Sequence, residues 1–236
     1  MALTWRGARL VERHAQTATA RSLAFTVPDW PGHLPGQHVD VRLTADDGYQ
    51  AVRSYSLAAP ADGDRIELGV QSVPDGEVSP YLADELPRGA EVEMRGPLGN
   101  WFVWRSEQTQ PVLLVAGGSG VVPLAAMIRA HRAARSPGPF HLLYSVRTPD
   151  DVWYRDHLDD RDPGLDVRIL YTRQAPPGST RAPGRLTPVD LDKPAARLRP
   201  DSPVYVCGPT GFVETVGDLL VDLGRDPATI RTERFG

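Results

Sequence analysis

The sequence predicts two domains of different fold class: an antiparallel β-barrel in residues 1–106 and an α/β domain with a doubly wound parallel sheet in residues 107–236. In the N-terminal part, short segments of alternating apolar and polar residues are separated by turn sequences, which is typical of closely spaced antiparallel strands. In the C-terminal part, uninterrupted apolar runs alternate with helix-forming segments, which is typical of a parallel sheet covered by helices. The polar segment from Arg105 to Gln110 separates the two patterns and places the domain boundary.

The composition is that of a globular protein, and it excludes several function classes. Apolar residues make up 41% and charged residues 24% of the 236 residues, which suits two domains of about a hundred residues each. The net charge of −4 provides no basic face, so we expect no nucleic-acid partner. The single cysteine, Cys207, cannot by itself hold an iron–sulfur cluster, which needs about four thiolates. The 6 histidines lack the spacing of metal ligands, and we expect no metal site.

The chain carries no signal for secretion or membrane insertion. Its N-terminus has no apolar core followed by a cleavage pattern. The segment from Pro111 to Ile128 is uncharged and about long enough to span a bilayer, but its centre is broken by glycines and a proline. A strand, turn and helix explain that segment better. We therefore expect a cytoplasmic protein, and the lone cysteine is compatible with a reducing compartment.

The N-terminal domain contains three clear strand patterns, which begin near Val39, Ser54 and Arg65. The turn sequences 45–48, 61–64 and 74–76 lie between and after them. A short helix is expected from Ser79 to Leu86, ended by Pro87. Ser79 then caps this helix, and free amides after Gly76 offer a phosphate site, although Gly and Ser before a helix are commonly only a cap.

Two residues of the second strand pattern combine a charge with an aromatic ring. Arg53 and Tyr55 are two residues apart and therefore lie on the same face of a strand, while Ser56 has the opposite register. An arginine suits a phosphate, and a tyrosine offers a flat surface for stacking. As a bare pattern this arrangement decides nothing.

The C-terminal domain opens with a glycine-rich turn, Gly117 to Pro123, between a buried strand and a helix. In this context the turn can seat a pyrophosphate, because glycines let the backbone approach closely and the helix N-terminus supplies free amides. Pro123 suits the first helical turn, although it stands where the usual dinucleotide fingerprint has its third glycine. The alternative is a tight strand–helix turn without a ligand.

The ends of the next two strand patterns carry cations and hydroxyls. One strand ends at Arg147 and the following one at Thr172 and Arg173. A dinucleotide fingerprint predicts an acidic residue here for the ribose hydroxyls, whereas arginines suit a phosphate on that ribose. The alternative is that both arginines are solvated loop residues. The Pro/Gly-rich segment 175–185 is expected to be a loop.

Nine short motifs occur in an order that resembles the ferredoxin–NADP reductase superfamily, and they cover nearly the whole chain. These motifs are PGQHV (35–39), RSYS (53–56), GEVS (76–79), GPLG (96–99), GGSGVVP (117–123), YSVR (144–147), YTR (171–173), VCGP (206–209) and ERF (233–235). The resemblance includes flavodoxin and ferredoxin reductases and stand-alone oxygenase reductase components. One departure is Ala59, where the family commonly has Ser or Thr, so the resemblance does not carry over one flavin hydrogen bond.

The resemblance implies site residues, position by position. Arg53 pairs with the flavin phosphates, Tyr55 packs on the flavin ring, and Ser56 hydrogen-bonds near flavin N5. The implied catalytic residues are Ser56, Cys207 and Glu233. The implied cofactor-binding residues are Arg53, Ser54, Tyr55, Ser56, Val70, Gly76, Val78, Ser79, Gly118, Gly120, Pro123, Arg147, Thr172, Arg173, Arg185, Cys207, Gly208, Pro209 and Phe235.

The resemblance also implies a function. The chain takes a hydride from NAD(P)H onto N5 of FAD and passes electrons to a separate acceptor, which is a ferredoxin, a flavodoxin or a redox-enzyme partner. FMN is the alternative flavin, and the arginines at the strand ends favour NADPH over NADH. Two other functions remain open: a free-flavin or quinone reductase, and a non-catalytic subunit that binds flavin or nucleotide in a larger complex.

Overall fold

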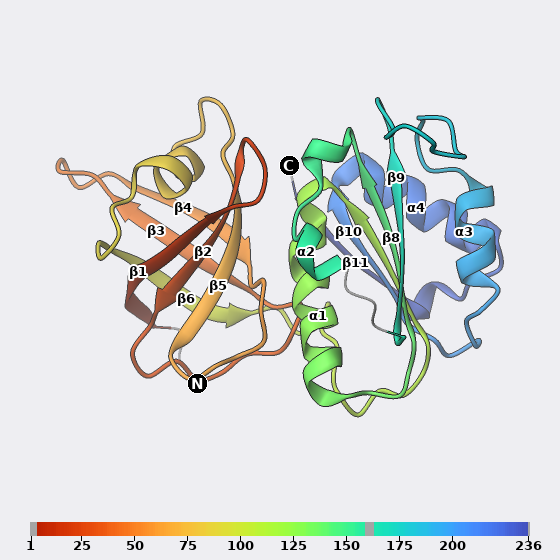
Figure 1. Ribbon diagram of the computed structural model, residues 1–236. Helices are drawn as coiled ribbons and strands as arrows, with labels where there is room; N and C mark the ends of the chain where they lie inside the picture. Colours follow the sequence, from red (N-terminus) through yellow and green to blue (C-terminus); the bar gives the residue numbers. More distant parts are fainter. Residues whose placement is uncertain (1–3, 159–162, 236) are drawn as a thin grey trace.

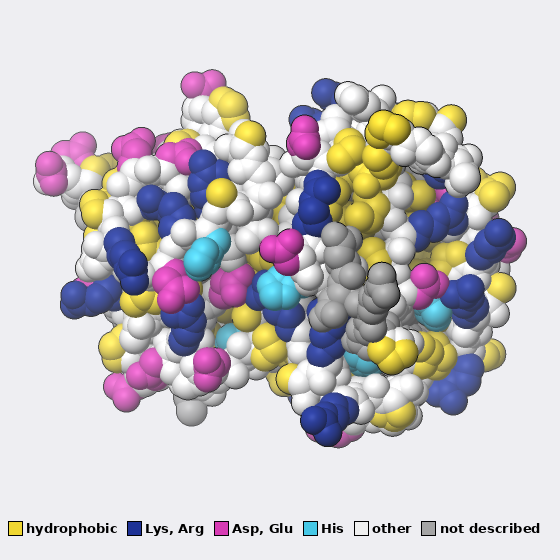
Figure 2. Space-filling view, in the orientation of Figure 1, with side chains coloured by type: hydrophobic (Ala, Val, Ile, Leu, Met, Phe, Trp, Pro, Cys, Tyr) yellow, Lys and Arg dark blue, Asp and Glu magenta, His cyan; other side chains and the backbone are white. Residues whose placement is uncertain are grey.

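A computed structural model describes residues 4–158 and 163–235, and it contains the two expected domains side by side (Figure 1). An antiparallel six-stranded sheet forms the N-terminal domain, and a parallel five-stranded sheet with helices forms the C-terminal one. Figure 2 shows one face of the molecule, on which acidic and basic side chains are interspersed over both domains. The fold class predicted from the two periodicities is confirmed.

The N-terminal sheet is a barrel with the strand order β4-β3-β6-β1-β2-β5. Its strands are β1 (Trp5–Ala15), β2 (Ala20–Thr26), β3 (His38–Thr44), β4 (Gln50–Ser56), β5 (Arg65–Gln71) and β6 (Glu91–Leu98). A bridge between Leu57 and Leu68 joins the end of β4 to β5, so the two edges of the sheet meet. Alternate residues of the strands point inward and form the barrel core.

The expected short helix is a single π-helical turn, η1 (Tyr81–Glu85). Leu82 and Leu86 are fully buried, as their spacing predicts. The prediction that Ser79 caps this turn is wrong, because Pro80 occupies the N-cap position and no side chain caps it. The Ser79 hydroxyl instead accepts a hydrogen bond from the Val73 amide at 3.2 Å, which closes the preceding turn.

The C-terminal sheet has the order β11-β10-β7-β8-β9, and all neighbouring pairs are parallel. Its strands are β7 (Val112–Gly117), β8 (Phe140–Val146), β9 (Leu165–Tyr171), β10 (Val204–Pro209) and β11 (Ile230–Phe235). The helices are α1 (Val121–Ala134), α2 (Arg155–Leu158), α3 (Pro188–Ala195) and α4 (Thr210–Asp222), with single turns η2 (Gly118–Gly120), η3 (Pro149–Asp151) and η4 (Pro227–Thr229). The chain moves outward from β7 through β8 to β9 and then returns to β10 on the other side. A crevice therefore opens between β7 and β10 at their carboxyl ends.

The helices cover the two faces of this sheet unequally. Helix α1 lies between the sheet and the barrel, whereas α3 and α4 cover the opposite face (Figure 1). Two separate apolar clusters correspond to these faces. The cluster around α1 also contains Ala20 and Ala58 of the barrel, so the core of the C-terminal domain continues into the domain interface.

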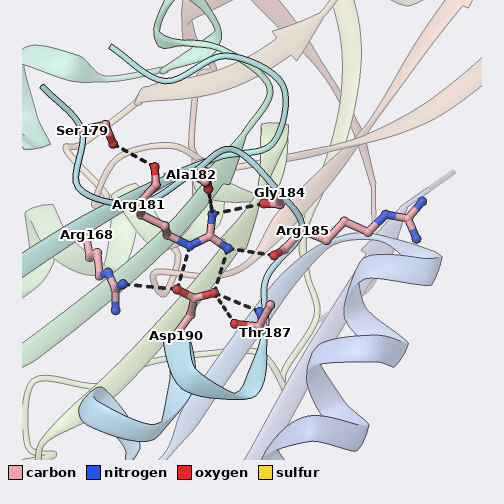
Figure 3. Close-up of polar contacts among 8 residues, drawn as sticks. All are labelled: Arg168, Ser179, Arg181, Ala182, Gly184, Arg185, Thr187 and Asp190. Atoms are coloured by element: carbon pink, nitrogen blue, oxygen red, sulfur yellow. Dashed lines mark hydrogen bonds and ion pairs between the residues drawn. The ribbon is translucent and has the colours of Figure 1, made fainter. Parts of the chain in front are cut away.

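The Pro/Gly-rich loop is held by a charged cluster around Asp190, on the first turn of α3 (Figure 3). Arg181 donates to both carboxylate oxygens at 2.9 Å, and Arg168 pairs with the same carboxylate at 3.2 Å. Thr187 completes a capping box with it. Burial would raise the pKa of Asp190, but the hydrogen bonds from Arg181 and Thr187 outweigh burial and hold that pKa below its usual range.

In the part of the chain that the structure describes, no helix is long and apolar enough to cross a bilayer. The uncharged segment 111–128 forms β7, η2 and the first half of α1.

Candidate functional site

A cavity lies at the carboxyl ends of the parallel strands, where the barrel meets the C-terminal domain. Gln71 at the end of β5 and the turn between β1 and β2 form its barrel side, and the glycine-rich turn and the ends of β8 and β10 form the other side. The lining residues are Thr17, Thr19, Gln71, Gly117, Gly118, Ser119, Ser145, Val146, Arg147, Asp151, Trp153, Thr172, Pro209, Phe212 and Phe235. The cavity thus brings together five of the motifs in the sequence.

The glycine-rich turn is packed directly on the strand that carries Cys207. A Cβ atom on Gly120 would lie 2.2 Å from the Cys207 carbonyl oxygen, so only glycine allows this approach. Gly118 has a φ of 56°, which favours glycine, and open space lies where its side chain would be. Pro123 lies in the first turn of α1, as expected. The turn lines the cavity and leads directly into a helix of 14 residues. The positive end of the helix dipole therefore lies next to the cavity.

Three residues that are far apart in the sequence meet where β4 of the barrel approaches β10 and β11. Ser56, at the end of β4, donates a hydrogen bond to the carboxylate of Glu233. Glu233 pairs with Cys207 across the neighbouring strands β11 and β10. The three residues implied as catalytic therefore come from both domains and lie together.

Burial controls the protonation of two of these groups. It raises the pKa of Glu233 to about 7, and the Ser56 hydrogen bond offsets only part of that rise. Burial also raises the pKa of the Cys207 thiol well above its usual value, and the nearby Glu233 charge adds to this. Cys207 is therefore a neutral thiol near pH 7 and unsuited to nucleophilic attack.

The flavin candidates lie on the outer part of β4. Arg53 donates to the carboxylate of Glu77 at 2.7 Å, and Tyr49 donates its hydroxyl to the same carboxylate at 2.8 Å. Tyr55 is half-buried, and burial raises its pKa to about 12. The Gly76 amide donates to the Val73 carbonyl at 3.0 Å, so the backbone amides of residues 77–79 with the exposed Arg53 are the donor set that fits a flavin diphosphate, and the Tyr55 ring fits an aromatic ligand.

Three implied flavin contacts stay predictions, and the structure shows where their side chains lie. Ser54 donates its hydroxyl to Asp40 at 2.7 Å, on the face of β4 opposite to Arg53 and Tyr55. Val70 and Val78 are 0% and 1% exposed and pack in the barrel core. Their side chains therefore cannot reach a bound cofactor, and only their backbone groups remain available.

The strand ends place two arginines next to each other. The Arg173 amide donates to the Arg147 carbonyl at 2.9 Å, and both side chains are exposed. Among the described residues Asp151 forms no ion pair with Arg147; its carboxylate accepts hydrogen bonds from the Thr148 amide and hydroxyl at 2.9 and 2.8 Å. Arg185 is different: its guanidinium points away from the Asp190 cluster (Figure 3), and it does not line the cavity.

Sequence reasoning missed several residues of the site. Glu77 lies within the GEVS motif, but the motif did not predict that its carboxylate binds Arg53. Phe212 packs its ring against Gly117 and Gly208, where added Cβ atoms would lie 2.7 and 2.8 Å from it. The position of Phe212 just after the VCGP motif is the feature of the sequence that could have identified it. Among the described residues, no group of three or more His, Cys, Asp or Glu is placed to hold a metal ion.

Comparison with known proteins identifies both domains. Residues 8–103 match the model of the oxidoreductase FAD-binding domain, and residues 114–218 match that of the oxidoreductase NAD-binding domain. The chain is 32% identical over 206 residues to the ferredoxin–NAD(P)+ reductase component of the naphthalene 1,2-dioxygenase/salicylate 5-hydroxylase systems of Ralstonia sp., which covers 85% of this chain and 60% of that protein.

Two solved structures show the same arrangement. The ferredoxin reductase in carbazole 1,9a-dioxygenase is 27% identical with a TM-score of 0.83, over 100% of this chain and 70% of that one. A ferredoxin NADP+ reductase from Neisseria gonorrhoeae with bound FAD and NADP shares the fold, with 19% identity, a TM-score of 0.83 and 98% of each chain covered.

The curated relatives are longer than this chain, which spans about 60% of the length of the first of them. Within that span, the two domain models follow each other in the order that the structure shows. The chain therefore belongs to the ferredoxin reductase-like oxidoreductases and consists of their FAD-binding domain followed by their NAD-binding domain.

Proposed function

We propose that the chain is an NAD(P)H-dependent flavoprotein reductase that delivers electrons to a separate protein acceptor. The observation that carries the proposal is the meeting of Ser56, Cys207 and Glu233 where the two nucleotide-binding domains join. Relatives include reductase components of dioxygenase systems, which supports an oxygenase or its ferredoxin as the acceptor class.

FAD, when bound, supplies the redox chemistry: it accepts two electrons as a hydride from NAD(P)H and can release them singly. The chain orients and shields the reacting partners. The glycine-rich turn would hold the nucleotide pyrophosphate, and the close packing of Gly120 on the Cys207 backbone fixes this turn against β10. Ser56 positions a hydroxyl between the barrel and Glu233, and the half-buried Glu233 carboxyl holds a proton below about pH 7. The neutral, buried Cys207 thiol excludes water from the place where Ser56 meets Glu233.

The proposal predicts that the purified protein retains FAD rather than FMN. Arg53 and the amides of residues 77–79 would hold a diphosphate, and of the two flavins only FAD carries one. Flavin released by heat should co-elute with FAD on chromatography, in a ratio near one per chain. Elution with FMN, or recovery of a flavin-free protein that FAD does not reconstitute, would contradict the prediction.

One observation favours the second candidate, a reductase that uses flavin as an exchangeable substrate. Glu77 competes for Arg53, and Ala59 lacks the hydroxyl that relatives commonly place near the flavin. Gel filtration separates the two functions. The proposed reductase stays yellow at micromolar concentration, whereas a free-flavin reductase loses its flavin but regains NAD(P)H oxidation when flavin is added.

A preference for NADPH over NADH is also expected. A charge-assisted contact to the ribose phosphate is worth about 1.5–3 kcal/mol, or roughly 10- to 150-fold in affinity. Arg147→Ala and Arg173→Ala should each raise the KM for NADPH and leave the KM for NADH nearly unchanged. Arg185→Ala is the matched control, because Arg185 lies at the end of the loop 175–185, whereas Arg173 adjoins Arg147, which lines the cavity. If the wild type prefers NADH, or if both cofactors suffer equally, these arginines do not bind the phosphate.

A further inference from the structure

An ion pair crosses the interface between the two domains, away from the catalytic residues. Arg129, on α1, donates to the carboxylate of Glu67, on β5, at 2.9 Å. The two side chains are only 16% and 24% exposed. Ser22 of β2 donates its hydroxyl to the other oxygen of Glu67. We call the Glu67–Arg129 pair, with Ser22, the interdomain clamp.

A tyrosine on the C-terminal domain packs against the arginine of the clamp. The Arg129 guanidinium lies 4.9 Å from the centre of the Tyr154 ring, in cation–π geometry. Tyr154 has a φ of 54°, which is uncommon for a residue with a side chain. Its amide donates to the side-chain oxygen of Gln16 in the barrel at 2.9 Å. The barrel therefore holds Tyr154 in place, and Tyr154 in turn faces Arg129.

The direct contact between α1 and β5 around the clamp has little directional preference. Gly69 lies two residues beyond Glu67, on the same face of β5, and a Cβ atom there would lie 2.4 Å from the Val122 side chain. Helix α1 therefore rests directly on the backbone of β5, next to Ala20 and Ala58. Small apolar surfaces allow close approach but do not fix rotation or sliding, because apolar contact is non-directional.

The clamp and the cavity are connected by the same two elements. On β5, Glu67, Gly69 and Gln71 share one face; the first binds Arg129, the second contacts α1 and the third lines the cavity. On α1, Arg129 lies about two turns beyond Val122, and the helix begins directly after the glycine-rich turn. A rotation of α1 about β5 would therefore move the nucleotide turn relative to the barrel.

We propose that Glu67 and Arg129 are positioning residues for hydride transfer: their ion pair fixes the orientation of α1 on the barrel and so the distance between the two cofactor sites. The inference rests on the proposed function. A charged hydrogen bond is directional, and the apolar contact around it is not, so the clamp selects one docking angle. A misplacement of about 1 Å can slow a reaction by about 100-fold, so a small rotation is enough to matter.

The experiment compares variants of the clamp by stopped-flow reduction of the flavin. Glu67→Gln and Arg129→Met should lower the limiting rate of reduction by about 10- to 100-fold. Flavin content and the NADPH dissociation constant should stay within about twofold of the wild-type values, because neither residue lines the cavity. Arg129→Lys keeps the charge and should restore part of the rate. The double variant Glu67→Gln/Arg129→Met should be no slower than either single variant, since both remove the same contact.

A pair within one domain provides the control. Arg42 and Glu93 join β3 to β6 through hydrogen bonds of 2.8 and 2.6 Å on the surface of the barrel, and both belong to the N-terminal domain. Arg42→Met and Glu93→Gln remove an ion pair without touching the interface, so the limiting rate should not change. An equal loss of rate in the control variants, or an unchanged rate in the clamp variants, would overturn the proposal.

A second measurement separates failure of the clamp from failure of the proposed function. Absence of flavin reduction by NAD(P)H in the wild type contradicts the proposed function. Hydrogen exchange needs no turnover: the clamp variants should exchange faster in the peptides of β5 and the first turns of α1, and the control variants should not. Unchanged exchange in the clamp variants counts against the clamp whatever the activity.

Discussion

Replacement of Ser56 by alanine is expected to slow flavin reduction by roughly 10- to 1000-fold, the usual effect of losing one hydrogen bond made in the transition state. Ser56 donates to Glu233 from the barrel side, so its hydroxyl joins the two domains at the point where the nicotinamide is expected to meet the flavin. Nucleotide affinity should change much less. Stopped-flow measurement at saturating NADPH gives the rate, and its dependence on concentration gives the affinity.

The same strand offers a control for this prediction. Ser54 donates its hydroxyl to Asp40 on the other face of β4, so Ser54→Ala should leave flavin reduction unchanged. Cys207→Ala should slow the same step as Ser56→Ala, but more mildly, because the buried thiol is neutral. An unchanged rate in Ser56→Ala would remove Ser56 from the catalytic residues.

Glu233 should make the stability of the flavin-free protein depend on pH. Its pKa in the folded state is about 7, above the ordinary value of 4.5, so the folded state binds its proton more tightly than the unfolded state. The stabilisation from this proton is complete below about pH 4.5 and is lost as the pH rises to about 7. The expected loss is about 3 kcal/mol in the free energy of unfolding, since one pKa unit corresponds to about 1.4 kcal/mol.

The measurement is denaturant unfolding of the flavin-free protein between pH 5 and 8. Glu233→Gln keeps the shape of the side chain and removes the titration, so the difference in unfolding free energy between wild type and variant should change by about 2.5 kcal/mol over this range. Glu91→Gln is the control, because Glu91 pairs with Arg9 on the exposed surface of the barrel. If the unfolding free energies of wild type and Glu233→Gln change in parallel with pH, the Glu233 carboxyl is not the source of the pH dependence.

Local patterns in the sequence predicted the fold well. Buried parallel strands are continuous apolar runs, whereas apolar and polar residues alternate in the barrel strands. The two domains therefore differ in the periodicity of their apolar residues, which a segment of about ten residues already shows. The meeting of Ser56 with Cys207 and Glu233 is not local, and only the ordered motifs suggested it. The capping box at Thr187 and Asp190 carried a readable signal, a hydroxyl residue three positions before an acidic one.

Other features could not be predicted because they depend on tertiary packing. The pattern alone does not tell whether Val70 and Val78 offer side chains or backbone to a ligand, and both side chains lie in the barrel core. The Ser79 hydroxyl could have accepted a hydrogen bond from an amide of the following helical turn or from the preceding turn, and it accepts one from the Val73 amide of the preceding turn. The Glu67–Arg129 pair joins two charged residues that local periodicity assigns to solvent on each domain.

The position of α1 makes the two domains poor modules for separation and recombination. Eight consecutive residues of this helix, Val121 to Ile128, are buried, which means that it is apolar around its whole circumference rather than along one stripe. One side of it is covered only by the barrel. A fragment that begins near residue 107 would expose this side as a continuous apolar patch, and such patches promote aggregation. Exchange of domains between related reductases should therefore transplant β5 and α1 together, as a matched pair of surfaces.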